Sequence, residues 1–230
     1  MKKLIIIPVY NEESSIRRVV ENLEQNYPEY DYIVVNDCST DNTKKLLQEN
    51  EYYFLDLPVN LGLSGAFQTG MLYAYENGYD YALQYDGDGQ HRAEYIENLF
   101  ECALSTGANI VIGSRFIDRK KPKNLRMLGS SLISLLIKIT SGTNISDPTS
   151  GMRLYDKSII KEYAMNIDYT PEPDTIVFLI RNGIVCKEVQ IEIDDRMSGE
   201  SYLNFKNAFL YMVKVIVSIT FLQWVRRRRL

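Results

Sequence analysis

Short apolar runs alternate with helical patterns through the first half of the chain. Apolar runs with the length of buried strands cover residues 4–9, 30–36, 52–57, 81–85 and 109–113. Between them, apolar residues recur at intervals of three and four, which is the spacing of a helix with one buried face. These helical stretches are residues 12–23, a segment capped at Thr40 or Asp41 that contains Leu46 and Leu47, residues 62–76 and residues 93–104. Apolar strands that alternate with helices predict an α/β fold with a mostly parallel sheet covered on both faces.

Polar residues follow three of these strands at the point where each strand ends. Residues 8–12 end the first strand, residues 36–37 the second and residues 86–88 the fourth. In parallel α/β sheets, ligands bind outside the carboxyl ends of the strands. Three polar strand ends at one edge of one sheet therefore predict a ligand site there.

The stretch from Tyr81 to His91 carries the most specific chemistry. Asp86 and Asp88 are separated by one residue, so on an extended segment their carboxylates project to the same side. Paired carboxylate oxygens suit Mg²⁺ or Mn²⁺, which commonly take substrate phosphates in their remaining positions. Gly87 and Gly89 permit a close approach of a bulky anion. The alternative is a strand end followed by an Asp-Gly turn, since this dipeptide is a common turn signal.

After Arg115 the alternation of strands and helices becomes irregular. The pattern predicts a basic loop over residues 119–123, an apolar helix over 125–139, a strand over 184–193 and turns at 147–153, 170–174 and 196–201. The turn at 170–174 opens a further helix.

The end of the chain has its own character. Residues 205–225 form an apolar helical pattern interrupted by lysine and glutamine, and four arginines follow at 226–229. No uninterrupted apolar run reaches the roughly 20 residues that a membrane span needs. We therefore expect this segment to lie on an anionic membrane surface, to form a homo-oligomer contact, or to pack on the helix at 125–139. We divide the chain into a domain of residues 1–202, with halves 1–115 and 116–202, and a C-terminal helix of residues 203–230.

Composition narrows the class of protein. The chain has 230 residues, of which 45% are hydrophobic and 24% charged, as is ordinary for a globular protein with a sizeable core. A net charge of −4 argues against a general nucleic-acid binder. The three cysteines are widely spaced and form no CxxC pair, which argues against a disulfide scaffold or a zinc ribbon and fits a reducing cytoplasm.

Six short motifs occur in an order that is typical of one family. They are Pro8-Val9-Tyr10-Asn11-Glu12-Glu13, Asn36-Asp37-Cys38-Ser39-Thr40-Asp41, Asn60-Leu61-Gly62, Asp86-Gly87-Asp88-Gly89-Gln90-His91, Gly113-Ser114-Arg115 and Asp147-Pro148-Thr149-Ser150-Gly151-Met152-Arg153. This set resembles family 2 glycosyltransferases with the GT-A fold, and most closely the branch of dolichyl- and polyprenyl-phosphate sugar synthases. The resemblance covers about residues 2–202. It implies transfer of a sugar from a nucleotide-sugar, with inversion at the anomeric carbon and the help of Mn²⁺ or Mg²⁺.

The resemblance also assigns residues to the donor. Pro8, Tyr10 and Glu12 line the nucleotide pocket, and Asp37 binds the edge of the base. An ionised Asp37 accepts hydrogen bonds only, so it can receive the N–H of uracil or the donors of guanine.

The metal and the phosphates have their own candidates within the same resemblance. Asp86 lies near the ribose and the metal, Asp88 is the direct metal ligand, and Gln90 is a further oxygen ligand. Arg115 and Arg153 match positions near the donor phosphates or the acceptor, and Arg196 and Ser201 match a loop that closes over the diphosphate. Three positions depart from the family pattern: Asn36 replaces an acid, Met152 an aromatic residue, and Tyr202 a lysine.

The need for a general base depends on the acceptor. A hydroxyl acceptor requires a carboxylate to remove its proton, and the candidates are Asp147, Glu172 and Asp174. A lipid phosphate is already anionic near neutral pH, because its second pKa is about 6. Each candidate has a structural alternative, since Asp147 precedes a proline in a turn and the other two lie where acids cap a helix.

The sequence therefore predicts a cytoplasmic, metal-dependent, inverting glycosyltransferase, at the cytoplasmic face of the membrane if its acceptor is a lipid. We expect a UDP-hexose donor ahead of a GDP-sugar. The acceptor is polyprenyl phosphate, or a hydroxyl of a growing glycan or glycoprotein. The second acceptor stays open because no membrane helices follow Arg229, whereas many lipid-phosphate relatives carry them. The alternatives are a catalytically inactive GT-A domain that serves as an assembly subunit, and a sugar nucleotidyltransferase, which the acidic, glycine-free loop at 8–12 disfavours.

Overall fold

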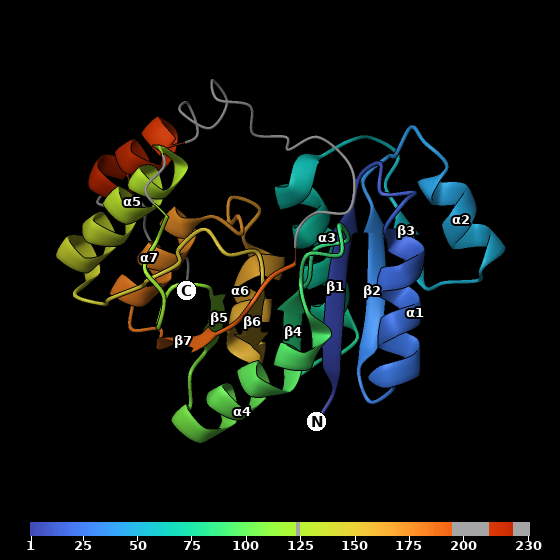
Figure 1. Cartoon of the computed structure of the whole chain (residues 1–230), viewed down its shortest axis with the longest axis horizontal. Coiled ribbons are helices and arrows are strands. Elements are labelled where there is room, and N and C mark those ends of the chain that lie inside the picture. Colours follow the sequence, from blue (N-terminus) through green and yellow to red (C-terminus); the bar gives the residue numbers. More distant parts are fainter. Residues whose placement is uncertain (123–124, 195–211, 223–230) are drawn as a thin grey trace.

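A single seven-stranded sheet forms the centre of the molecule (Figure 1). The computed structural model describes residues 1–122, 125–194 and 212–222. The strands lie in the order β3-β2-β1-β4-β6-β5-β7. Their bounds are β1 Lys3–Val9, β2 Asp31–Asn36, β3 Phe54–Asp56, β4 Tyr81–Gln84, β5 Ile110–Ser114, β6 Arg153–Asp156 and β7 Cys186–Gln190. All pairs are parallel except those of β6, which runs antiparallel to both of its neighbours.

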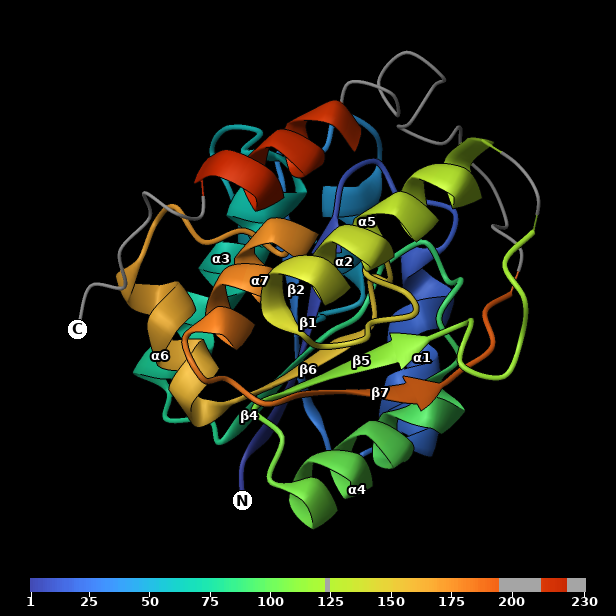
Figure 2. The ribbon, with the colours of Figure 1, turned by 90° about the vertical axis from the view of Figure 1, so that its left-hand side faces the viewer.

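Helices cover both faces of this sheet (Figures 1 and 2). Their bounds are α1 Ile16–Asn26, α2 Thr43–Glu49, α3 Gly62–Glu76, α4 Ile96–Thr106, α5 Leu125–Ser141, α6 Lys157–Met165 and α7 Pro173–Arg181, with a 3-10 turn at Ala93–Tyr95. One core cluster joins the sheet to α3, α5, α6 and α7, and the other joins it to α1, α2 and α4. Strand β1 contributes Leu4 and Ile6 to the first cluster and Ile5 and Ile7 to the second. The predicted α/β sheet, apolar on both faces, is confirmed.

The strand order places a crevice at the carboxyl end of β1. The chain leaves β1 for β2 on one side and later returns to β4 on the other, so the direction of winding reverses between β1 and β4. In open α/β sheets this reversal opens a ligand crevice at the carboxyl ends of the two strands. Residues 8–12 and 86–88 follow β1 and β4, so the topology brings two of the polar strand ends to this crevice.

The sequence pattern missed one strand and one helix. Strand β6 has only four residues, Arg153–Asp156, and it follows directly on the predicted turn at 147–153. So short a run has no measurable periodicity, and it is a strand because it pairs with both β4 and β5. Helix α6 begins immediately after it, where the Asp156 carboxylate accepts hydrogen bonds from the backbone N–H groups of Ser158 and Ile159.

The described part of the C-terminal segment is helical. Residues 212–217 form α-helix and Ser218–Leu222 form π-helix, and Val215 and Ile219 are buried in the first core cluster. The Ser218 hydroxyl donates a hydrogen bond to Asp174 Oδ2 on α7 at 2.6 Å. One of the three expectations, packing on the helix at 125–139, is thus met over these residues. The rest of the predicted helix and the proposed boundary at 202/203 lie outside the described residues, and the division at 115/116 stays a prediction. None of the described helices has the length and apolar character needed to cross a membrane.

A close contact between α3 and β1 gives a test of this packing. A Cβ atom added at Gly70 would lie 2.3 Å from Cγ2 of the fully buried Ile6. Alanine in a helix normally exceeds glycine in stability by roughly 0.5–1 kcal/mol. We predict the opposite sign for Gly70→Ala, a loss of about 1–3 kcal/mol in the free energy of unfolding measured with urea, because the core is overpacked. The control is Leu72→Ala on the same helix, which is exposed and should change this free energy by about 0.5 kcal/mol or less. A Gly70→Ala protein as stable as the parent would contradict the packing.

Candidate active site

The loops after β1 and β2 are bonded to each other. Asn11 has a φ of 58°, and its Oδ1 accepts hydrogen bonds from the backbone N–H groups of Thr40 at 2.8 Å and Asp41 at 3.3 Å. The Asn11 N–H in turn donates to Ser39 Oγ at 3.0 Å. These bonds fix the loop that carries Tyr10, whose side chain is exposed, and its role in a nucleotide pocket stays a prediction.

The other two residues assigned to the nucleotide pocket, Pro8 and Glu12, are held by neighbouring parts of the fold. Pro8 is buried in β1, paired with Val35 of β2. The Glu12 N–H donates to Thr43 Oγ1 at 2.9 Å, and Glu12 Oε2 accepts a bond from Ser15 Oγ at 2.7 Å. The carboxylate of Glu12 therefore helps to start α1, which begins at Ile16 rather than at residue 12 as the sequence predicted.

Asp37 is bonded to the end of β1 and to the residues that precede α3. Its N–H donates to the carbonyl of Val9 at 2.9 Å, and its Oδ1 accepts the N–H of Leu61 at 2.7 Å. Asn60 Nδ2 donates to the Asp37 carbonyl at 3.2 Å. The side chain is nearly buried beside the start of α3. The motif at 60–62 thus holds Asp37, the aspartate predicted to bind the base, in place. The sequence alone did not indicate this contact.

The loop after β4 packs tightly against β1. A Cβ atom at Gly87 would lie 2.4 Å from Val9 Cγ1, and Gly89 has a φ of 74°. Both positions therefore favour glycine for steric reasons. Asp88 is nearly buried, and its Oδ1 accepts the N–H of Gln90 at 3.0 Å. Gln90 Nε2 donates to the carbonyl of Asp194 at 3.1 Å.

His91 contacts both the backbone and the carboxylate of Asp86. The Asp86 N–H donates to His91 Nδ1 at 3.0 Å, so this ring nitrogen carries no proton. His91 Nε2 lies 3.6 Å from Asp86 Oδ2. The Tyr85 hydroxyl donates to the His91 carbonyl at 2.5 Å, and burial raises the Tyr85 pKa well above its ordinary value, which keeps it a donor. His91 is thus a supporting residue beside the carboxylate of Asp86.

The chain leaving β7 lies along the same loop. The Asp194 N–H donates to the Gln90 carbonyl at 2.9 Å, and His91 and Ile193 form an antiparallel bridge. Arg92 binds Asp194 Oδ1 through Nε at 2.7 Å and Glu192 Oε2 through Nη1 at 3.1 Å. The sequence did not predict these ion pairs, because partners 100 or more positions apart leave no local pattern. Arg196 and Ser201 follow this segment, but they lie outside the described residues.

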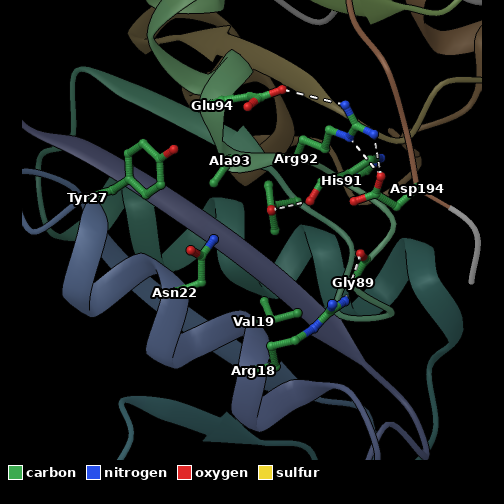
Figure 3. Close-up of a pocket in the computed structure, with 11 residues that line it drawn as sticks. Arg18, Val19, Asn22, Tyr27, Gly89, His91, Arg92, Ala93, Glu94 and Asp194 are labelled. Carbon is green, nitrogen blue, oxygen red and sulfur yellow. Dashed lines mark hydrogen bonds and ion pairs between the residues drawn. The ribbon is translucent and has the colours of Figure 1, made fainter. Parts of the chain in front are cut away.

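A cavity of about 420 Å³ lies beside α1 and this loop (Figure 3). Arg18, Asn22, Tyr27 and Arg92 contribute to its lining, and Arg18 Nη2 donates to the Gly89 carbonyl at 3.3 Å. None of the residues assigned to the nucleotide, the metal or the acceptor lines it. We therefore do not assign the donor to this cavity.

A buried ion pair follows β5. Arg115 donates to both carboxylate oxygens of Asp147, with Nε to Oδ2 at 2.6 Å and Nη2 to Oδ1 at 2.8 Å. Burial raises the pKa of the Asp147 carboxyl, but the hydrogen bonds and charge of Arg115 outweigh it, and the pKa lies below its usual range. Glu188 of β7 accepts the N–H of Asp147 at 2.9 Å and that of Ser146 at 2.7 Å. Asp147 therefore orients Arg115, and its geometry favours this role over that of a base.

The turn at 147–153 reaches the carboxylate loop. A Cβ atom at Gly151 would lie 2.4 Å from Asp86 Oδ2, so the turn touches this carboxylate directly. Arg153 is buried and donates to the carbonyls of Pro171 at 2.6 Å and Pro148 at 2.8 Å. It thus ties the turn that carries Asp147 to the turn that precedes α7. Its predicted place near the donor phosphates stays a prediction.

The two remaining acids lie at the start of α7. Glu172 is the N-cap residue, and its side chain makes no capping bond. Asp174 lies in the first turn and accepts the Ser218 hydroxyl, so its carboxylate holds the C-terminal helix.

The carboxylates after β4 fit a divalent cation. They offer oxygen ligands, with Asp88 nearly buried and about a third of the Asp86 side chain exposed. Within the described residues, no group of three or more His, Cys, Asp or Glu side chains is placed to hold a metal ion. Two carboxylates suit Mg²⁺ or Mn²⁺, because these ions take phosphate and water oxygens in the remaining positions.

Comparison with known proteins identifies the family. The model of glycosyl transferase family 2 matches residues 4–164. The UDP-N-acetylglucosamine–dolichyl-phosphate N-acetylglucosaminyltransferase of Methanococcus voltae is 33% identical, over 82% of this chain and 84% of that protein. The undecaprenyl-phosphate mannosyltransferase of Micrococcus luteus is 32% identical, over 89% of this chain and 88% of that protein.

Solved structures agree on the fold. Glucosyl-3-phosphoglycerate synthase from Mycobacterium tuberculosis, crystallised with Mn²⁺, UDP-glucose and phosphoglyceric acid, superimposes with a TM-score of 0.69. It is 15% identical, and the match covers 98% of this chain and 81% of that one. With the family match over most of the chain, the predicted GT-A fold is confirmed: the chain belongs to glycosyl transferase family 2 and is a glycosyltransferase.

Proposed function

We propose that this chain transfers a hexose from a nucleotide-sugar to polyprenyl phosphate, with inversion at the anomeric carbon. The observation that carries this proposal is the pair of relatives above, which match over 84% and 88% of their length and are named for transfer to dolichyl or undecaprenyl phosphate. An anionic lipid headgroup also fits the arginine and the divalent cation expected at the carboxyl edge of the sheet. With this acceptor, the cytoplasmic face of a membrane is the proposed location.

On the donor side, Asp37 is proposed to accept an N–H of the base. Its other oxygen is already bonded to Leu61, which fixes the carboxylate against rotation. Uracil and guanine both present such a donor. We favour a UDP-sugar because UDP is the nucleotide in the name of the M. voltae relative.

The reaction requires stabilisation of the negative charge that develops on the leaving nucleoside diphosphate. An oxygen of the acceptor phosphate bonds to the anomeric carbon, and the bond from that carbon to the diphosphate breaks, releasing the nucleoside diphosphate. A divalent cation on Asp86 and Asp88 supplies positive charge to this diphosphate when bound. Arg115, held in one orientation by Asp147, adds a preorganised donor without reorganisation during the reaction.

The hydrogen bonds of the candidate bases favour a phosphate acceptor. Asp147 gives both of its oxygens to Arg115, and Asp174 accepts a bond from Ser218. A phosphate with a second pKa of about 6 is largely dianionic near neutral pH and needs no base. A glycan hydroxyl would need one, and of the three predicted acids we test Glu172, the N-cap residue of α7.

Asp88 tests the reaction class. We expect the purified protein with Mn²⁺ or Mg²⁺ to release nucleotide from one member of a panel of UDP- and GDP-sugars, and EDTA to stop this release. Asp88→Asn should lower the rate on the order of a hundredfold or more, because a metal ligand and its charge are lost. The control, Asp118→Asn, removes an exposed carboxylate outside the site and should leave the rate unchanged. Absence of both nucleotide binding and turnover in the parent protein would favour the inactive assembly subunit.

Acidification tests the buried ion pair. The folded-state pKa of Asp147 is lower than its ordinary value of 3.8, so the pair stabilises the fold above about pH 4 and loses this effect as pH falls through the lower folded value. Asp147→Asn should cost about 3–5 kcal/mol of unfolding free energy at neutral pH, since Arg115 loses its buried partner. Urea titrations at several pH values should show a smaller loss on acidification for the variant than for the parent. Equal pH profiles would contradict the assignment.

Glu172 distinguishes the two acceptors. With polyprenyl phosphate as acceptor, Glu172→Gln should change the transfer rate by less than about tenfold, because a general base contributes about 10²–10⁴ only where a proton must be removed. Glu101→Gln on the exposed face of α4 is the control for surface charge. Transfer of labelled sugar into a lipid-extractable product is the measurement. A thousandfold loss in Glu172→Gln would contradict a transfer that needs no general base.

A further inference from the structure

Gln90 is bonded on three sides in the loop after β4. Its N–H donates to Asp88 Oδ1 at 3.0 Å, so the residue lies directly beside a carboxylate that is predicted to hold the metal. Its carbonyl accepts the N–H of Asp194 at 2.9 Å, and its Nε2 donates to the carbonyl of Asp194 at 3.1 Å. Because the amide nitrogen is directed at Asp194, the oxygen of the same planar group is directed away from it and can bind a ligand. The position of Asp194 therefore decides the orientation of Gln90, the predicted further metal ligand.

Arg92 holds Asp194 in place. Its Nε and Nη2 both lie 2.7 Å from Asp194 Oδ1, and its Nη1 lies 3.1 Å from Glu192 Oε2. Figure 3 shows Arg92 directed at Asp194 beside the loop. The guanidinium is planar, so donors on its different edges bind the two acids in one fixed geometry. Arg92 thus fastens the chain that follows β7 to the loop that follows β4.

These contacts form a closed ring around the loop. Arg92 follows Gln90 by two positions, and His91 between them forms an antiparallel bridge with Ile193. Arg92 is 36% exposed and Asp194 49%, and ion pairs so exposed contribute little to the stability of a fold. An effect of Arg92 on the site would therefore come from the position of Asp194, and not from a loss of folded protein.

We propose that Arg92 is a positioning residue for the metal: through Asp194 it orients the amide of Gln90 beside Asp88. A group that holds a metal ligand in place is typically worth about 10–100-fold in metal affinity. Because the pair of Arg92 and Asp194 is partly exposed, we expect a value at the lower end of this range. The inference rests on the proposed function in that the carboxylates after β4 hold a divalent cation.

The charge of Arg92 separates this role from a purely electrostatic one. A guanidinium near a bound cation repels it, so charge alone predicts tighter Mn²⁺ binding when Arg92 is removed. Positioning of Gln90 predicts weaker binding. Arg119 is the matched control, because it is also an exposed arginine paired with Glu192, and within the described residues it has no bond to Asp194 or Gln90.

Mn²⁺ affinity tests the proposal without turnover. Unbound Mn²⁺ is measured by electron paramagnetic resonance in titrations of the full chain with UDP present. We expect Arg92→Ala to bind Mn²⁺ about tenfold more weakly than the parent, and Arg119→Ala to stay within about twofold of the parent. Unfolding by urea should be nearly the same in the three proteins, since both arginines are exposed. Equal or tighter binding of Mn²⁺ by Arg92→Ala would overturn the proposal.

A double-mutant cycle tests whether Arg92 acts through Gln90. Gln90→Ala removes the amide and should itself weaken Mn²⁺ binding. In that background Arg92→Ala should change the affinity by less than about twofold, because the group that it orients is gone. A tenfold loss from Arg92→Ala in both backgrounds, or a Gln90→Ala protein that binds Mn²⁺ like the parent, would contradict the positioning role.

The same proteins separate this inference from the proposed function. A parent that shows the full cycle but transfers no sugar to polyprenyl phosphate would end the proposed function and leave the role of Arg92 standing. A parent that transfers the sugar, with an Mn²⁺ affinity that Arg92→Ala does not change, would end the role of Arg92 and leave the function standing.

Discussion

The buried ion pair between Arg115 and Asp147 is the constraint that holds together the side of the candidate site formed by β5, β6 and β7. Removing two charges from water costs several kcal/mol for each, and good geometry with further hydrogen bonds must offset this cost. Here Arg115 contacts both oxygens of Asp147, and Glu188 receives two backbone N–H groups of the same turn. These partners come from the end of β5, from the turn before β6 and from β7, so the orientation of Arg115 depends on the pairing of all three strands.

The antiparallel strand β6 explains why this turn reaches the carboxylates. A parallel strand between β4 and β5 would enter the sheet at its amino edge, far from Asp86. Since β6 runs in the opposite sense, the residues that precede it lie at the carboxyl edge, where Gly151 packs against Asp86. Arg153, the first residue of β6, then fixes the turn before α7 through the Pro171 carbonyl. One reversed strand therefore brings Gly151 to Asp86 and joins the two turns through Arg153.

Much of this fold follows from the sequence because its strands are apolar throughout and its helices are strongly periodic. The helix at 62–76 was predicted to the residue, and the four-residue strand β6 was missed because its length gives no period. The motif at 86–91 predicted a metal site from the spacing of Asp86 and Asp88, and this assignment stays a prediction. The ion pairs of Arg92 and the burial of Asp147 could not be predicted, since they depend on partners from β7 and β5 that only the folded sheet brings near. Short motifs can be predicted from the sequence, but ion pairs between distant segments depend on the order of the strands in the sheet.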